Sequence, residues 1–203
     1  ILNNCNLKIK KIFLKSFITG ANISDNNLDI NTFFKIKIKQ DISKIFYFEN
    51  NSLKYEQNFK FGSNLILKDI SKITSLKKDI IEIILNEITF DKNILEEELI
   101  DENFFKDFPY RKIKKKLIYD ISLARIEEIL DIIIFKNINI NFYNKQSNAI
   151  FFEIENELYS KSLKEFFKKI LKSNNFEVKS FNKLSDEKML ETVNKLVHFG
   201  WKK

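Results

Sequence analysis

The chain has 203 residues, of which 44% are hydrophobic, enough to build one large core or two small ones. Three glycines, at Gly20, Gly62 and Gly200, are too few and too scattered for a glycine-rich nucleotide loop, and one Cys and one His exclude a zinc site or a Cys–His catalytic pair. The net charge of +7 reflects Lys, which supplies 33 of the 35 basic residues. We attribute this excess to AT-rich codon usage and to a solvated surface rather than to nucleic-acid binding.

The first half of the chain predicts an antiparallel meander. Over residues 32–39 apolar side chains alternate with Lys, and a period of two is typical of a strand that is buried on one side. Asn tolerates the left-handed backbone conformation that tight turns require. The expected elements are strands at 7–14, 32–39, 42–48 and 53–61, a short helix or turn at 16–23, and a tight turn at 50–52.

After Gly62 the apolar period changes from two to that of a helix. We expect Ser75 and Ser185 to cap helices, Pro109 to begin a long one, and Ser162 with Glu165 to form a capping box. The expected helices cover 62 to about 73, 75 to about 88, 109 to about 136, 162–171 and 185 onward, with strands at 149–154 and 176–181. This order predicts an α/β layer fold with a mixed sheet. No segment is long and apolar enough to span a membrane, and we expect both ends to be cuts through a longer protein.

Four stretches in this order resemble the second half of an actin-like ATPase, and within that superfamily they resemble the bacterial cell-division protein FtsA. They are Leu7–Leu14, Leu53–Asn64 followed by Asp69-Ile70-Ser71, Arg125–Leu130, and Leu196–Gly200. The resemblance implies an actin-like, ribonuclease H-like half with an inserted subdomain. It divides the chain into the end of a preceding lobe with an entry strand (1–31), subdomain 2A (32–75 and 137–184), a 2B-like insert with the long helix (76–136), and a closing helix (185–203).

Two departures from the family concern ATP. The family's turn between the first two meander strands is Asp-Ile-Gly-Gly-Gly-Thr, whose glycines let backbone N–H groups approach phosphate. Here the turn is Lys39-Gln40-Asp41-Ile42-Ser43, and the family's adenosine-binding Gly-Gly is replaced by Glu155-Asn156-Glu157. We therefore expect weak or absent ATP binding, with ATP and Mg²⁺ bound only if the cleft survives, and the missing glycines disfavour an active ATPase.

The resemblance also nominates individual residues. Gly62, with Ser63, stands at the family's cleft glycine and is a remnant of a nucleotide site or a plain strand-to-helix turn. Arg125 matches a family arginine on the surface that receives the acidic C-terminal tail of FtsZ, and Arg111 is a second candidate for that role, since arginine pairs bidentately with carboxylates. The alternative is an intrahelical pair of Arg125 with Glu127 or Glu128.

Three other features of the sequence give weaker indications of function. The basic run 111–116 near several aromatic residues permits a nucleic-acid interpretation, but it also fits a solvated face. His198 has no Cys or His partner, so we interpret it as structural. Asp41 and Asp69 are a possible residual carboxylate pair, without a phosphate cradle to support hydrolysis.

These observations favour a divergent FtsA-like cell-division protein of the septum that tethers FtsZ filaments to the cytoplasmic face of the inner membrane. The resemblance implies two partners besides the FtsZ tail: copies of itself in actin-like protofilaments, and the membrane, contacted through an amphipathic segment absent from this sequence. The alternatives are an FtsA-like pilus-assembly protein and a basic nucleic-acid-binding protein.

Overall fold

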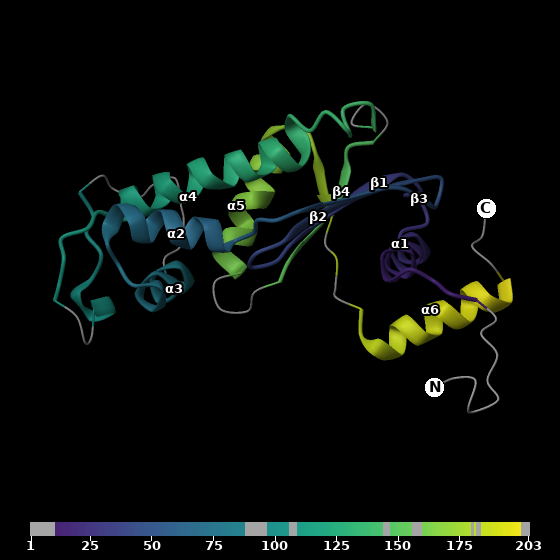
Figure 1. The fold of residues 1–203 in the computed structure, drawn as a ribbon, viewed down its shortest axis with the longest axis horizontal. Coiled ribbons are helices and arrows are strands. Elements are labelled where there is room, and N and C mark those ends of the chain that lie inside the picture. Colours follow the sequence, from purple (N-terminus) through teal and green to yellow (C-terminus); the bar gives the residue numbers. More distant parts are fainter. Residues whose placement is uncertain are drawn as a thin grey trace.

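A computed structural model of the chain describes residues 11–87, 97–105, 109–143, 147–155, 160–179, 181 and 184–199 (Figure 1). The strands are β1 (Phe33–Ile38), β2 (Ser43–Glu49), β3 (Ser52–Phe59), β4 (Ala149–Ile154) and β5 (Glu177–Lys179). The helices are α1 (Lys15–Asn26), α2 (Asn64–Thr74), α3 (Lys78–Glu87), α4 (Lys115–Leu130), α5 (Ser160–Ser173) and α6 (Asp186–Phe199), with a 3-10 turn η2 (Glu102–Phe105) and a π-helical turn η3 (Asp131–Phe135).

The strands form one mixed sheet in the order β3-β2-β1-β4-β5. β1, β2 and β3 are antiparallel neighbours, whereas β4 runs parallel to β1 and β5 parallel to β4. Asn50 and Asn51, with φ of 48° and 61°, make the tight turn between β2 and β3 in the left-handed conformation that such hairpins need. The predicted fold class, a three-strand antiparallel meander followed by α/β units in a mixed sheet, is confirmed.

Neighbouring residues of β1 face opposite sides of the sheet and belong to different cores. Phe34 is buried in the large cluster that β1, β2 and β4 form with α2 to α5, while Phe33 is buried in a second cluster to which α1 contributes Ile23. Helix α6 packs on α1 through Leu196. Figure 1 shows α1 and α6 grouped together, apart from α2, α3 and α4 at the other end of the molecule. The division of the chain into 2A and 2B segments stays a prediction, and the large cluster is continuous across it.

Several local predictions are wrong. Residues 11–14 are not in a strand, and residues 7–10 of that predicted strand lie outside the described part. Ser75 does not cap α3: it ends α2 in the left-handed conformation, with φ 57°. Pro109 precedes the long helix by several residues, because Leu99 and Lys114 pair in an isolated β-bridge and α4 begins only at Lys115.

The last helices follow the sequence pattern in part. Ser185 does cap α6, since its hydroxyl accepts the backbone N–H of Lys188 at 3.3 Å. Ser162 lies inside α5, which begins by Ser160, and so is not its N-cap. In α6 itself, Leu190 is 65% exposed, and the buried position near it is Thr192.

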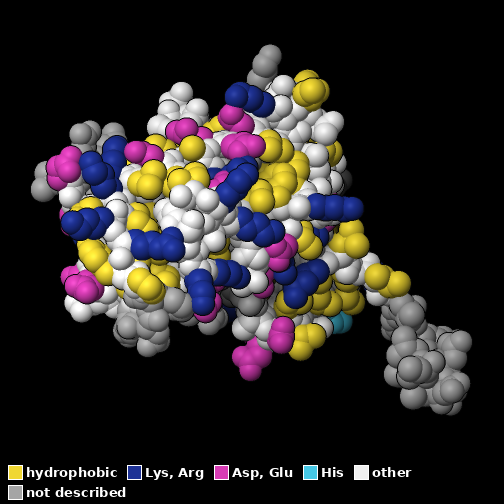
Figure 2. Space-filling view, turned by 60° about the vertical axis from the view of Figure 1, so that its left-hand side comes forward, with side chains coloured by type: hydrophobic (Ala, Val, Ile, Leu, Met, Phe, Trp, Pro, Cys, Tyr) yellow, Lys and Arg dark blue, Asp and Glu magenta, His cyan; other side chains and the backbone are white. Residues whose placement is uncertain are grey.

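On the face seen in Figure 2, Lys and Arg side chains are mixed with Asp and Glu. In the predicted basic run, Lys114 pairs with Glu97, Lys115 with Glu98, and Lys116 with Asp120. These three carboxylates pair with three of the five basic side chains of the run, and the nucleic-acid interpretation stays a prediction. None of the described helices combines the length and apolar character required to cross a bilayer.

Candidate functional site

The turn between β1 and β2 is tied to the start of α2. The backbone N–H of Ser63 donates to the carbonyl oxygen of Lys39, and that of Asn64 donates to Gln40, both at 2.9 Å. A Cβ on Gly62 would lie 2.1 Å from the Lys39 oxygen, so this approach requires glycine. The side-chain amide of Asn64 adds a bond to Asp41 at 3.0 Å.

This arrangement bears on the proposed cofactor residues Gly62 and Ser63. The N–H groups at the start of a helix are those that commonly bind phosphate. Here two of them already donate to carbonyl oxygens of the turn, and Gly62 has a packing role. A role for Gly62 and Ser63 in binding a cofactor stays a prediction. In the described part of the chain, no group of three or more His, Cys, Asp or Glu side chains is placed to hold a metal ion.

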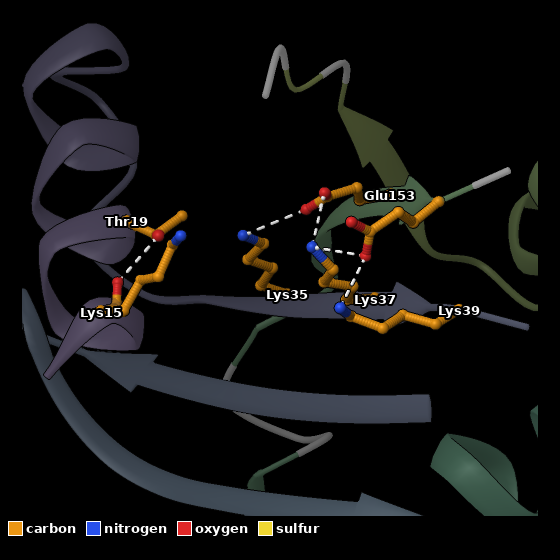
Figure 3. A network of polar contacts seen from close by, with 7 residues as sticks. Lys15, Thr19, Lys35, Lys37, Lys39 and Glu153 are labelled. Atoms are coloured by element: carbon orange, nitrogen blue, oxygen red, sulfur yellow. Dashed lines mark hydrogen bonds and ion pairs between the residues drawn. The ribbon is translucent and has the colours of Figure 1, made fainter. Parts of the chain in front are cut away.

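Beside this turn lies a network that we call the lysine–glutamate ladder. It consists of alternate residues of β1 and β4 on the α1 side of the sheet, together with the two residues that follow them: Lys35, Lys37, Lys39, Glu153 and Glu155. Glu153 bridges Lys35 at 3.3 Å and Lys37 at 3.0 Å, and Glu155 bridges Lys37 at 3.1 Å and Lys39 at 2.9 Å (Figure 3). The ladder therefore joins the β1–β2 turn to the segment after β4.

Burial and charge act differently along the ladder. Lys35 is only 7% exposed, and this burial lowers its pKa although the Glu153 carboxylate opposes the shift. Burial also disfavours the charged form of Lys37, but hydrogen bonds and charges of Glu153 and Glu155 outweigh it and raise the Lys37 pKa. The hydrogen bond from Lys39, with that from Lys37, lowers the pKa of Glu155 to about 2. Glu155 is therefore ionised at neutral pH.

The ladder forms one wall of a pocket of about 530 Å³ between the sheet and α1. The whole pocket lining carries five Lys and three Glu side chains. Apolar side chains line the remainder, among them Leu14, Phe46 and Met189. The size falls in the range of about 300–1,000 Å³ that is usual for small-molecule sites. The pocket is positively charged overall, which favours anions.

Both arginines make contacts within the chain. Arg125 of α4 donates to Asp69 of α2 through Nε and to Glu128 through Nη1 at 2.6 Å, so the intrahelical pair considered from the sequence is present. Arg111 donates to the carbonyl oxygens of Thr74 and Ser75 at 3.3 and 3.5 Å, which satisfies the C-terminal end of α2. The role of either arginine in binding a partner stays a prediction.

The remaining candidates are the carboxylates Asp41 and Asp69, which were considered as a pair, and His198. Asp41 accepts from Asn64 and Asp69 accepts from Arg125, so each carboxylate is engaged by a different side chain. His198 is exposed on α6, beside the Phe199 ring. From the sequence, Lys39 and Glu155 are separate replacements in two different ATP-binding segments of the family. The signal was available: Lys at 35, 37 and 39 has the same spacing of two as Glu at 153 and 155.

Comparison with known proteins supports the fold. No family model matches the sequence, and no curated protein is significantly similar to it. Among solved structures, MreB5 of Spiroplasma citri bound to ADP is 14% identical with a TM-score of 0.55, covering 96% of this chain and 61% of that one. A non-polymerisable quadruple mutant of pCBH ParM is 14% identical with a TM-score of 0.55, covering 93% and 55%.

The archaeal actin homologue Ta0583 is similar to the same extent, at 11% identity and a TM-score of 0.52, covering 92% of this chain and 56% of that one. The chain thus spans somewhat more than half the length of each of these structures. Identities this low establish the architecture and nothing further. The chain has the actin-like fold and corresponds to a little over half of such a protein.

Proposed function

We propose that this chain is the second lobe of an actin-like, filament-forming scaffold whose assembly does not depend on ATP hydrolysis. The observation that carries the proposal is the β1–β2 turn: its carbonyl oxygens accept the N–H groups of Ser63 and Asn64, and Lys39 of the turn is paired with Glu155. The similarity to MreB5, ParM and the archaeal actin homologue supports a cytoskeletal role. A scaffold of this kind works by self-association and by tethering.

The more specific part of the proposal is that this scaffold is FtsA-like and acts at the division septum. It would bind the acidic C-terminal tail of FtsZ on the surface around α4 and hold FtsZ filaments at the cytoplasmic face of the inner membrane, through a membrane-binding segment outside this sequence. What supports it is the order of family-like stretches along the chain and the position of both arginines at α2 and α4.

The contacts of Arg125 indicate how an acidic tail would bind. Asp69 accepts the Nε–H of the guanidinium and so fixes its direction. Glu128, an exposed residue one helical turn further along α4, accepts a hydrogen bond from Nη1. A carboxylate of the tail would replace Glu128 and leave the Asp69 contact intact. Glu128 is therefore a competitor for the proposed binding site, and its removal should strengthen binding of the tail.

Fluorescence anisotropy with a labelled FtsZ C-terminal tail peptide tests this site. We expect Arg125→Ala to abolish binding and Arg111→Ala to weaken it, whereas Glu128→Gln should tighten binding several-fold because it releases Nη1. Glu127→Gln, on the same helix but without a contact to Arg125, is the matched control and should bind as the wild type does. Equal binding by wild type, Arg125→Ala and Glu128→Gln would exclude this surface.

Sedimentation of the full-length protein tests the scaffold role separately. We expect polymer of equal amount in ATP, in ADP and without nucleotide. Polymer that forms only with hydrolysable ATP and disperses as the ATP is consumed would overturn the proposal of an ATP-independent scaffold. This outcome does not depend on whether the FtsZ tail binds.

A further inference from the structure

Two ammonium groups face each other inside the pocket between α1 and the sheet. Figure 3 shows the side chain of Lys15, from the first turn of α1, pointing toward the end of Lys35 on β1. The charge of Lys15 is one of the influences that lower the pKa of Lys35, so the two groups repel each other. Between two like charges in a partly closed pocket, an anion is the natural occupant.

The acidic side chains of the pocket are already engaged elsewhere. Glu153 and Glu155 hold the three lysines of the ladder, and Glu56 holds Lys44 at 3.5 Å. Lys15 has no carboxylate partner within the described residues. Its ammonium group is thus a positive charge of the pocket that no carboxylate of the described residues balances.

Lys35 is fixed in place for such a role. Its ammonium group contacts Glu153 on one side and lies 4.4 Å from the centre of the Phe181 ring on another. A lysine held from two sides loses little freedom when it binds a third group. The pair thus combines a buried lysine whose ammonium group is held from two sides with an exposed lysine.

The start of α1 adds to the positive potential at the same place. No side chain caps this helix, since Leu14 stands at the N-cap, and its first turn contains no acidic residue. Leu14, Lys15 and Ser16 all line the pocket. The N–H groups of the first turn and the helix dipole therefore favour an anion near Lys15.

We propose that Lys15 and Lys35 bind a phosphate group in the pocket between α1 and the sheet, without a metal ion. The ligand class is a phosphate-bearing small molecule or inorganic pyrophosphate: the pocket is larger than a phosphate group, and its apolar wall offers contact for an organic moiety. The site uses side chains and the start of α1 rather than the β1–β2 turn. It does not depend on the proposed scaffold role.

Isothermal titration calorimetry of the full-length protein with inorganic pyrophosphate, in EDTA, tests the site. Wild type should bind, and Lys15→Met should bind at least about tenfold more weakly, since a hydrogen bond to a charged group is lost. Lys112→Met removes an exposed lysine far from the pocket in sequence and outside its lining, and should leave the affinity unchanged. Titration with AMP and ATP in the same buffer distinguishes a free phosphate ligand from a nucleotide.

A charge reversal provides a readout that needs no ligand. Lys15→Glu replaces repulsion of Lys35 by attraction, so we expect this variant to lose pyrophosphate binding while its urea midpoint rises. Failure of the folded wild type to bind pyrophosphate would overturn the proposal. So would an equal loss of affinity in Lys112→Met, which would indicate general charge attraction, or binding that appears only when Mg²⁺ is added.

Discussion

Replacing Gly62 by Ala tests the close contact on which the β1–β2 turn depends. The added Cβ would lie 2.1 Å from the carbonyl oxygen of Lys39 and 2.7 Å from that of Gln40. Both are backbone atoms between paired strands, so they have no rotamer by which to move aside. The turn and the start of α2 must separate, and the two hydrogen bonds between them must lengthen or break.

The size of the effect follows from those contacts. Two backbone hydrogen bonds contribute about 0.5–1.5 kcal/mol each, and forcing an extra methyl group into packed atoms costs about 1–3 kcal/mol. Ala restricts the unfolded chain and returns about 0.4–1 kcal/mol. The strain and the lost bonds partly describe the same displacement, so we expect a net loss of about 2–3 kcal/mol in the free energy of unfolding.

Urea denaturation followed by circular dichroism measures this loss. At about 2 kcal/mol per molar urea, the midpoint should fall by about 1–1.5 M. Lys68→Ala, an exposed substitution on α2, is the control and should change stability by less than about 0.5 kcal/mol. If Gly62→Ala changes the free energy of unfolding by less than about 0.5 kcal/mol as well, the turn and α2 are not in the contact described, and our account of this glycine is wrong.

Three further predictions concern charged and polar contacts. Because the pKa of Glu155 falls from 4.5 to about 2 on folding, ionised Glu155 stabilises the protein above about pH 4.5, and the advantage over Glu155→Gln should shrink as the pH falls from 4.5 toward 2 in urea titrations. A double-mutant cycle of Arg125→Ala and Asp69→Ala should give a coupling of about 1 kcal/mol, since both side chains are one-quarter exposed. Asn137→Ala should cost about 1–3 kcal/mol, because this buried amide donates to Gln57 and to the π-helical turn η3.

Each of these predictions has an outcome that contradicts it. A stability difference between wild type and Glu155→Gln that stays constant with pH would mean that Lys39 does not hold the carboxylate. Additive losses in the double-mutant cycle would mean that Arg125 does not connect α4 to α2. An Asn137→Ala protein as stable as wild type would mean that water replaces the amide where the long helix ends.

The fold was predictable because its main signals are local. Alternation over 32–39 and 53–61 and the Asn50-Asn51 turn indicate a meander without reference to the rest of the chain. Helix ends were less predictable, since Ser75 and Pro109 occur in both starting and ending contexts. Tertiary contacts decide which context applies. The β-bridge of Leu99 with Lys114 moves the start of the long helix to Lys115, and no local sequence pattern predicts this bridge.

The candidate site was missed because β1 was interpreted as a strand with one face in water. Alternating Lys fits that interpretation, and AT-rich codon usage made Lys uninformative. The structure places β1 in the middle of the sheet, where α1 covers the Lys face and Lys35 is buried. A buried ammonium needs a carboxylate or must lose its proton.

Because of that requirement, the order of the strands predicts where acidic residues must lie. A parallel neighbour of β1 must present acidic residues at the same spacing of two, and Glu153 and Glu155 are the residues of β4 and its end that do so. The same reasoning then applies to the helix that covers this face. α1 brings Lys15 rather than an acidic residue toward the ladder, and no carboxylate of the described residues pairs with Lys15. The charge pattern of three separate elements, combined with the order of the strands, therefore indicates both how the buried lysines are balanced and where an external anion would complete the balance.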